Sequence, residues 1–179
     1  MSVISAARGV TQVMHRCESA KQNGFLDLSA CDLMYVADAL YMVLKGYSVT
    51  KCSLSSNALK KFPAKMITKF PDMIQFSIAS NAVTELPEEI SNWKLKAINL
   101  ASNKFAKIPE AIYQMKDLQV LDLSDNEIEN IDIKKLITSL PNLKLLNLSN
   151  NPLPVKHLQD ILGHQTKTLQ IKYVVSNTE

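Results

Sequence analysis

A motif with the pattern LxxLxLxxNxLxxL recurs along most of this 179-residue chain. Its asparagine falls at positions 57, 81, 103, 126 and 151, and Cys31 occupies the same position in an earlier copy. Successive copies therefore lie 26, 24, 22, 23 and 25 residues apart. Six copies at such similar spacing constrain the fold more than any other feature, because they predict six similar units stacked one after another.

Each copy predicts a short β-strand followed by a turn. The two apolar residues of LxL alternate with a more polar one, so both face the same side of the strand. One unit cannot bury that face alone, whereas stacked units join their strands into a parallel sheet and their apolar side chains into one core. The asparagine has donors and an acceptor, so it can bond backbone groups where the chain leaves the strand. We therefore predict a structural asparagine ladder at Asn57, Asn81, Asn103, Asn126 and Asn151.

The motifs resemble those of the leucine-rich repeat superfamily, in its intracellular class with LxxLPxxI repeats. The resemblance is carried by LDLSACDL, CSLSSNALKKFP, FSIASNAVTELP, INLASNKFAKIP, LDLSDNEIENI and LNLSNNPL, which together cover residues 23–153. It implies an α/β fold, a right-handed solenoid (horseshoe) of six repeats with a concave parallel β-sheet. It brings no catalytic activity and no defined ligand that could be transferred to particular residues.

The segments on either side of the repeats are predicted to cover the two ends of the solenoid. Residues 3–20 carry an apolar stripe at helical spacing; such a helix could bind a membrane, but we expect an N-terminal cap. Residues 155–162 predict a short helix, and residues 169–175 a degenerate last strand with Leu169 and Ile171 in the LxL positions and Val174 in the asparagine position. On the convex side, residues 37–44 and 132–140 predict helices, with Asp132 as cap or first-turn acid. We expect one domain over residues 1–179: cap helix 1–22, repeats 23–153 and C-terminal cap 154–179.

Side chains that alternate with the LxL pairs are predicted to form the concave face. The column between the two leucines is small and polar, and an apolar strip of Ala97, Val120 and Leu145 lies beside it. Small residues here could simply tolerate strand curvature, or they could form a shallow docking surface for a helix or loop of a protein partner. The docking hypothesis assigns partner binding to Lys51, Ser53, Gln75, Ser77, Asn99, Val120, Asp122, Leu145 and Asn147.

No pattern in the chain predicts catalysis, a metal site or a cofactor. Asp27, Asp122 and Asp125 are carboxylates predicted near the strands, but His15, His157 and His164 fall in the predicted caps, away from them. The chain has 4 glycines and no glycine-rich phosphate-binding motif. We therefore expect no catalytic, metal-binding or cofactor-binding residues and no small-molecule substrate.

The three cysteines, Cys17, Cys31 and Cys52, form no CxxC motif and are odd in number. We predict that all three are reduced, buried and unreactive, which favours an intracellular protein, cytoplasmic or nuclear. The sequence predicts no secretory signal and no transmembrane segment.

Charge is distributed unevenly along the chain. The net charge is +3, yet residues 72–132 carry 11 acidic and 5 basic side chains, so the basic residues concentrate in the two end segments. These ends give the alternative hypothesis, peripheral binding to an anionic surface or nucleic acid. We rank it below a non-enzymatic interaction scaffold that binds a protein partner through the concave face.

Overall fold

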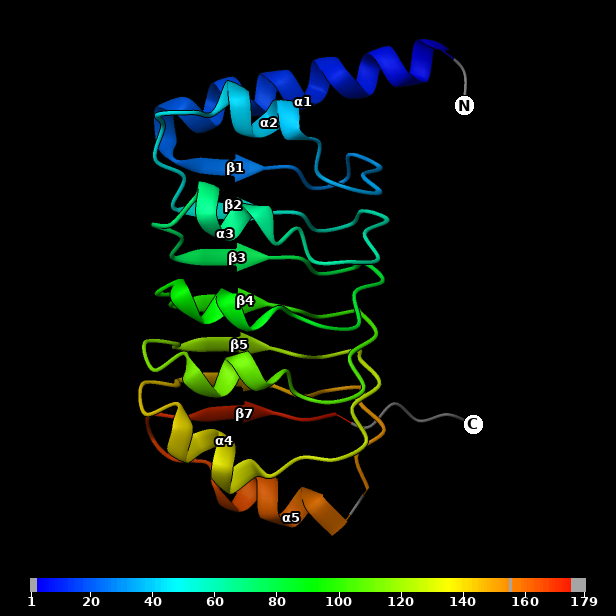
Figure 1. Ribbon diagram of the computed structural model, residues 1–179. Coiled ribbons are helices and arrows are strands. Elements are labelled where there is room, and N and C mark those ends of the chain that lie inside the picture. Colours follow the sequence, from blue (N-terminus) through cyan, green and yellow to red (C-terminus); the bar gives the residue numbers. More distant parts are fainter. Residues whose placement is uncertain (1–2, 155, 175–179) are drawn as a thin grey trace.

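The computed structural model describes the backbone of residues 3–154 and 156–174, and the side chains of residues 11–154 and 159–174. Seven short parallel strands form one sheet in which they follow each other in sequence order (Figure 1). The strands are β1 (Phe25–Asp27), β2 (Lys51–Ser53), β3 (Gln75–Ser77), β4 (Ala97–Asn99), β5 (Val120–Asp122), β6 (Leu145–Asn147) and β7 (Gln170–Lys172). The predicted α/β leucine-rich repeat solenoid is confirmed.

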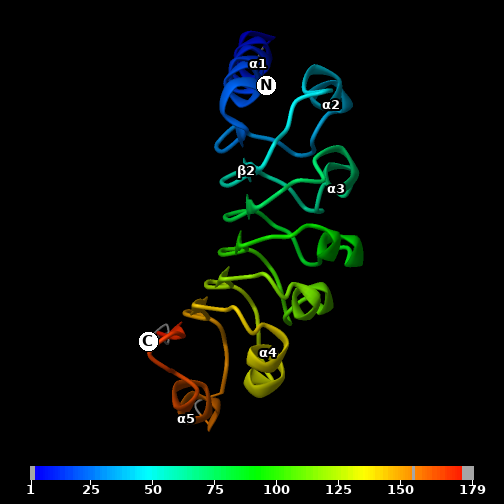
Figure 2. The same ribbon diagram turned by 90° about the vertical axis from the view of Figure 1, so that its left-hand side faces the viewer.

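Helices and 3-10 turns return the chain along the side opposite the strands, as Figure 2 shows. They are α2 (Asp38–Val43), α3 (Lys65–Lys69), η1 (Glu88–Asn92), η2 (Glu110–Gln114), α4 (Ile133–Ser139) and α5 (Lys156–Gly163). The helices expected at 37–44 and 132–140 are confirmed as α2 and α4. The Asp132 side chain caps α4 by accepting a bond from the Lys135 backbone amide at 2.8 Å. A five-residue 3-10 helix follows each of Pro87 and Pro109, whereas the short α-helix α3 begins two residues after Pro63.

The core lies between the sheet and these helices. Both members of every LxL pair in the six repeats are buried, from Leu26 and Leu28 to Leu146 and Leu148. In the second and third repeats Phe62, Phe76 and Trp93 pack together, with ring centroids 5.2–6.0 Å apart. The indole Nε1 of Trp93 donates to the Phe70 carbonyl at 2.8 Å, so this large side chain is buried without losing its hydrogen bond.

The asparagines bond to backbone groups of two consecutive repeats. Asn103 shows the pattern: its Nδ2 donates to the carbonyls of Leu100 and Ala101 in its own repeat and of Ile78 in the repeat before. Its Oδ1 accepts from the Val83 amide at 3.0 Å. Asn57, Asn81, Asn126 and Asn151 make the corresponding bonds. One amide side chain thus satisfies four backbone groups where the strands end, and five in the case of Asn57.

The residue before each asparagine position, including the position that Cys31 occupies, has a left-handed backbone conformation. It is Ala30, Ser56, Ser80, Ser102, Asp125 or Asn150, with φ between 51° and 57°. Only Asp125 and Asn150 are residue types that tolerate this region well. The turn out of the strand therefore imposes the same strain on most repeats.

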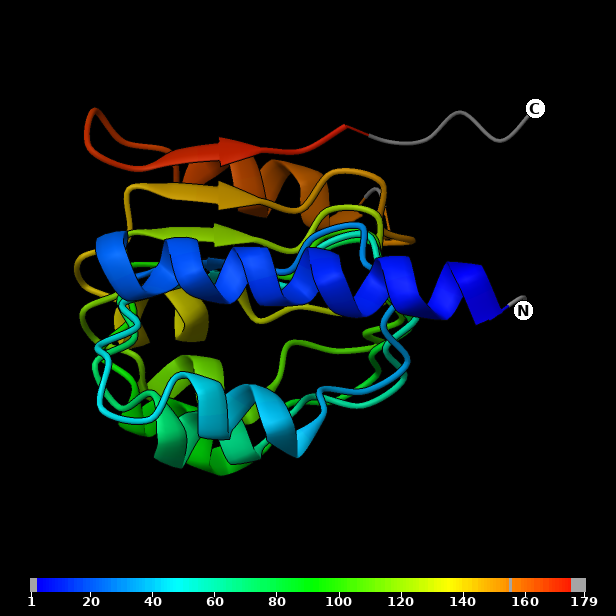
Figure 3. The ribbon, with the colours of Figure 1, turned by 90° about the horizontal axis from the view of Figure 1, so that it is seen from above.

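At each edge of the sheet, one long side chain donates hydrogen bonds to backbone carbonyls in or just after the edge strand. Helix α1 (Val3–Asn23) runs across the β1 end, seen from above in Figure 3. Its Arg16 Nη1 donates to the carbonyls of Asp27 at 3.0 Å and Ser29 at 2.6 Å, while Cys17 and Ala20 are buried beneath it. At the other edge, Gln165 Nε2 donates to the Ile171 carbonyl at 2.6 Å. Unpaired edge carbonyls that would invite another strand are thus partly satisfied within the chain.

The predicted register of the last strand is wrong by two residues. Leu146 pairs with Ile171, so Ile171 and Tyr173 hold the LxL positions, and the asparagine position falls at 176 rather than 174. Residue 176 lies outside the described residues. The shift places Tyr173 at the end of the core, where its half-buried ring lets the hydroxyl donate to the Leu153 carbonyl at 3.1 Å.

The prediction that all three cysteines are buried is also wrong for Cys31, which is half-exposed. Its position lies at the open side of the first repeat, with no earlier strand to cover it. The thiol of Cys31 makes a weak bond to the Ser29 carbonyl at 3.5 Å. Cys17 and Cys52 are buried as predicted, and burial raises the pKa of both thiols. Of the predicted apolar stripe on the first helix, Val3, Ala6, Ala7 and Val10 lie outside the described side chains.

Candidate protein-binding site on the concave face

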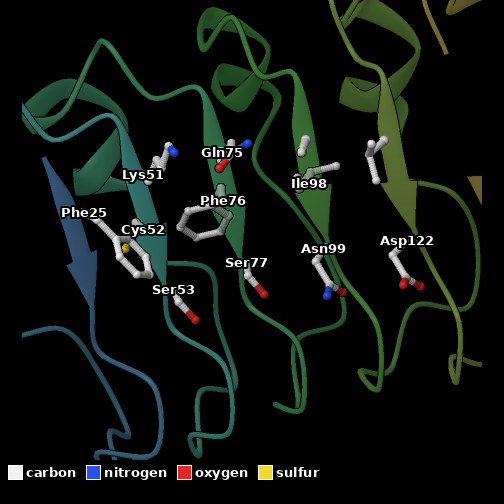
Figure 4. A pocket seen from close by; sticks show the side chains of 12 residues that line it. Phe25, Lys51, Cys52, Ser53, Gln75, Phe76, Ser77, Ile98, Asn99 and Asp122 are labelled. Atoms are coloured by element: carbon white, nitrogen blue, oxygen red, sulfur yellow. The ribbon is translucent and has the colours of Figure 1, made fainter. Parts of the chain in front are cut away.

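Two rows of outward side chains run across the strands on the concave face, as Figure 4 shows. One row starts with Phe25, Lys51 and Gln75, and the other contains Ser53, Ser77, Asn99 and Asp122. Each row holds one residue per strand because the parallel register places equivalent positions side by side. Outward residues at equivalent positions of successive repeats thus form a continuous surface.

These rows border a shallow groove of about 520 Å³ that spans β1 to β5. Seven of the nine residues assigned to partner binding line it, namely Lys51, Ser53, Gln75, Ser77, Asn99, Val120 and Asp122. Leu145 and Asn147 lie on β6 and are not part of its lining. The core residues Cys52, Phe76 and Ile98 also belong to its lining.

The polar side chains in the central row are held by local hydrogen bonds. Asp122 Oδ1 accepts from the amide and the hydroxyl of Ser124, at 3.0 and 2.6 Å, and its Oδ2 accepts from Asn147 Nδ2 at 3.2 Å. Asn99 Oδ1 accepts from the Ala101 amide at 2.9 Å. A partner would therefore meet side chains whose positions are already fixed, which lowers the entropic cost of binding.

Asp27, on β1, is held in the same way. Burial opposes its ionisation, but hydrogen bonds from Ser29 and the charge of Arg16 outweigh that effect and lower the pKa of the Asp27 carboxyl. It therefore faces the edge as an anion paired with α1.

Lys51 and Gln75 are the free side chains of this surface. Both are exposed, and neither forms a hydrogen bond or ion pair with the described part of the chain. Three strand spacings separate Lys51 from Asp122, about 14 Å, so the groove has a cation towards one end and a carboxylate at the other. Phe25, which the partner-binding hypothesis did not include, lies 40% exposed on the first strand and adds an aromatic ring to this surface.

Other kinds of site were sought among the described residues. No three histidine, cysteine, aspartate or glutamate side chains come close enough together there to bind a metal ion. Of the helices that the structure describes, none has the length and apolar character needed to cross a membrane.

Sequence and structure comparisons agree with this fold. Residues 93–153 match the family model described as Leucine rich repeat. The fission yeast adenylate cyclase is 30% identical over 104 residues, which are 55% of this chain and 6% of that protein. Chaoptin of Drosophila melanogaster is 27% identical over 130 residues, covering 72% of this chain and 10% of the relative. The chain thus spans a tenth or less of the length of these two relatives.

Solved structures show the same solenoid. A leucine-rich repeat protein of Leptospira interrogans superposes with a TM-score of 0.62 and 28% identity over 77% of this chain and 34% of its own. An internalin of Listeria monocytogenes gives a TM-score of 0.63 at 18% identity, over 85% of this chain and 41% of its own. The chain thus has the fold of leucine-rich repeat proteins, which is commonly a protein-interaction module and generally not an enzyme.

Proposed function

We propose that this chain is a non-enzymatic interaction scaffold that binds a protein partner through its concave groove. One observation carries the proposal: Phe25 is 40% exposed, and the exposed Lys51 and Gln75 have no hydrogen-bond or ion-pair partner among the described residues, yet all three lie on the same face as side chains fixed by hydrogen bonds. An aromatic anchor among preorganised polar groups is the arrangement that protein interfaces favour.

The proposal includes an intracellular location and the LxxLPxxI class of repeats. The location is supported by three free cysteines. The class is supported by the apolar-proline pairs Phe62-Pro63, Leu86-Pro87 and Ile108-Pro109 in the second to fourth repeats.

The experiment compares two variants with the same change in charge. Lys51→Glu with Gln75→Arg alters the groove, and Lys69→Glu with Asn92→Arg alters α3 and η1 on the helix side. All four positions are exposed, so both variants should keep the thermal unfolding midpoint of the unmodified chain. Partners captured from a cytosolic extract are then quantified by mass spectrometry.

We expect at least one abundant partner to lose most of its capture with the groove variant and to keep it with the helix-side variant. Equal capture by both variants would contradict the concave site. Purified partner and chain then give a dissociation constant, which we expect the groove variant to raise at least tenfold.

The alternative, binding of an anionic surface or nucleic acid by the basic ends, ranks second. Several of those cations are engaged within the chain: Arg16 with Asp27, Lys21 with Glu18 at 2.6 Å, and Lys135 with Glu110 at 3.4 Å. Retention on heparin that falls steeply between 50 and 200 mM salt, roughly the range over which phosphate contacts weaken, would reverse this order.

A further inference from the structure

The first repeat differs from the next four at the two positions that lie three and four residues after the asparagine position. Later repeats carry Lys60-Lys61, Thr84-Glu85, Ala106-Lys107 and Glu129-Asn130 there. The first repeat carries Met34-Tyr35, and these side chains are 65% and 73% exposed. Single exposed apolar residues are ordinary. The packing of the solenoid does not explain why two consecutive large apolar side chains are exposed here. The next four repeats have small or polar residues at the same positions.

Met34 and Tyr35 border a second groove, separate from the concave one. It has a volume of about 430 Å³ and lies between the segments that leave β1 and β2. Buried Tyr41, Leu59 and Phe62 contribute to its lining. The groove therefore has an apolar interior and an apolar outer wall, so it suits one or two large apolar side chains of a ligand.

The residues that the second repeat contributes to this groove include cations. Lys60 and Lys61 are exposed, and neither has an ion-pair or hydrogen-bond partner in the described part of the chain. Lys65 is different, because its Nζ lies 2.7 Å from Asp38 Oδ1 and 5.6 Å from the centroid of the Tyr41 ring. Its charge is thus neutralised locally, whereas the charges of Lys60 and Lys61 remain available to a ligand.

We propose that this groove binds an acidic peptide segment of another protein, with one or two large apolar side chains against Met34 and Tyr35 and carboxylates facing Lys60 and Lys61. Methionine and tyrosine suit such a surface, because both are enriched at protein interfaces and adapt to varied ligands. A flat lipid surface would not place groups inside the groove, so a peptide fits its shape better. The inference does not depend on the concave site.

The test is selection of a random dodecapeptide phage library on the immobilised full chain. We expect the enriched peptides to share a large apolar residue next to two or more acidic ones. A labelled synthetic peptide of the enriched sequence is then titrated by fluorescence anisotropy. Its dissociation constant should rise at least tenfold with Met34→Ser/Tyr35→Ser and at least tenfold with Lys60→Glu/Lys61→Glu.

Matched variants test the position of the site. Met42 is 77% exposed in the same repeat but does not line the groove, and Lys104 and Lys107 are exposed lysines of the fourth repeat. We expect Met42→Ser and Lys104→Glu/Lys107→Glu to change the dissociation constant less than twofold, as should Lys51→Glu/Gln75→Arg in the concave groove.

Several results would overturn the proposal. These are no enrichment, enrichment of peptides without acidic residues, or affinity that is unchanged by the groove variants. Concentration-dependent dimers lost in Met34→Ser/Tyr35→Ser would instead assign the surface to a second copy of this chain. Cosedimentation with phosphatidylserine vesicles that the same variant abolishes would assign it to a membrane.

Discussion

The first and fourth repeats follow one template but differ in what occupies its asparagine position. Asn103 of the fourth repeat joins its own strand end to the repeat before it, through Ile78 and Val83. Cys31 of the first repeat has no earlier strand to join, and its amide is bonded by Asn57 of the next repeat at 3.1 Å. The comparison indicates that the asparagine stabilises a junction between repeats rather than a repeat. At the free end, Arg16 of α1 replaces it as the donor to exposed carbonyls.

The largest effect should come from removing the amide in the middle of the ladder. Asn103→Ala leaves three carbonyls and one amide without their partner, and we expect the free energy of unfolding to fall by about 3 kcal/mol. Cys31→Ala should lower it by about 0.5 kcal/mol, because the thiol makes one weak bond. Urea denaturation followed by circular dichroism measures both. Equal losses would show that the ladder does not act through junctions.

Next in size is removal of the donor that replaces the ladder at the first edge. Arg16→Met keeps a long apolar side chain but loses the bonds to Asp27 and Ser29, so we expect a loss of about 2 kcal/mol. Gln165→Met at the β7 edge removes one uncharged bond and should cost about 1 kcal/mol. The same urea titration applies. A larger loss for Gln165→Met than for Arg16→Met would contradict the role assigned to α1.

A smaller loss of stability should appear at alkaline pH, and it should be larger for the tyrosine of the first repeat than for that of the fourth. Burial, with a smaller contribution from the Asp38 charge, raises the pKa of Tyr41 in the first repeat from 10.0 to about 12. Its contribution to stability is therefore fully present below pH 10 and is lost as pH rises from 10 to about 12. We expect that loss to be about 1 to 2 kcal/mol, since each pKa unit corresponds to about 1.4 kcal/mol.

Substitution of the tyrosines isolates this effect from other groups that titrate in the same range. Tyr41→Phe should remove the part of the alkaline loss that Tyr41 causes. Tyr113→Phe in the fourth repeat should remove less, because Tyr113 is only half-buried, although burial raises its pKa too. Unfolding free energies at pH 9, 10 and 11 measure the difference. Identical pH profiles for the unmodified chain and Tyr41→Phe would contradict this account.

The smallest effects concern the left-handed residue before each asparagine position. Ala30→Gly and Ser102→Gly should each stabilise the chain by about 0.5 kcal/mol, since glycine adopts this conformation without strain. Asn150→Gly should change stability little, because asparagine already tolerates it and donates to Asp125 at 2.8 Å. Thermal unfolding midpoints rank the three variants. A loss of stability in Ser102→Gly would show that the strain is absent.

The interior of the fold could be predicted from the sequence because neighbouring repeats fix the register of each other's strands. Each strand from β2 to β6 pairs on both sides with strands that have the same apolar positions, so a shift in register would expose all of them. β7 has such a neighbour on one side only. Its register was therefore constrained by one neighbouring strand alone. Ile171 and Tyr173 take the LxL positions in place of the expected pair, Leu169 and Ile171.

The two ends and the exposed surfaces were harder to predict. No pattern indicated that Arg16 reaches the carbonyls of Asp27 and Ser29, 11 and 13 residues away. Met34 and Tyr35 follow the motif spacing and were not singled out. Comparison of their columns across the repeats could have found them, because the next four repeats place mainly polar residues there.

The ladder also has a direction, with a consequence for how the chain is made. Each of the five ladder asparagines bonds to its own repeat and to the one before it, as Asn57 does with Leu28 and Asn151 with Leu123. During synthesis the partners of each amide have therefore already left the ribosome when that asparagine emerges. Each new repeat can complete its junction at once, without waiting for residues that have not yet been translated.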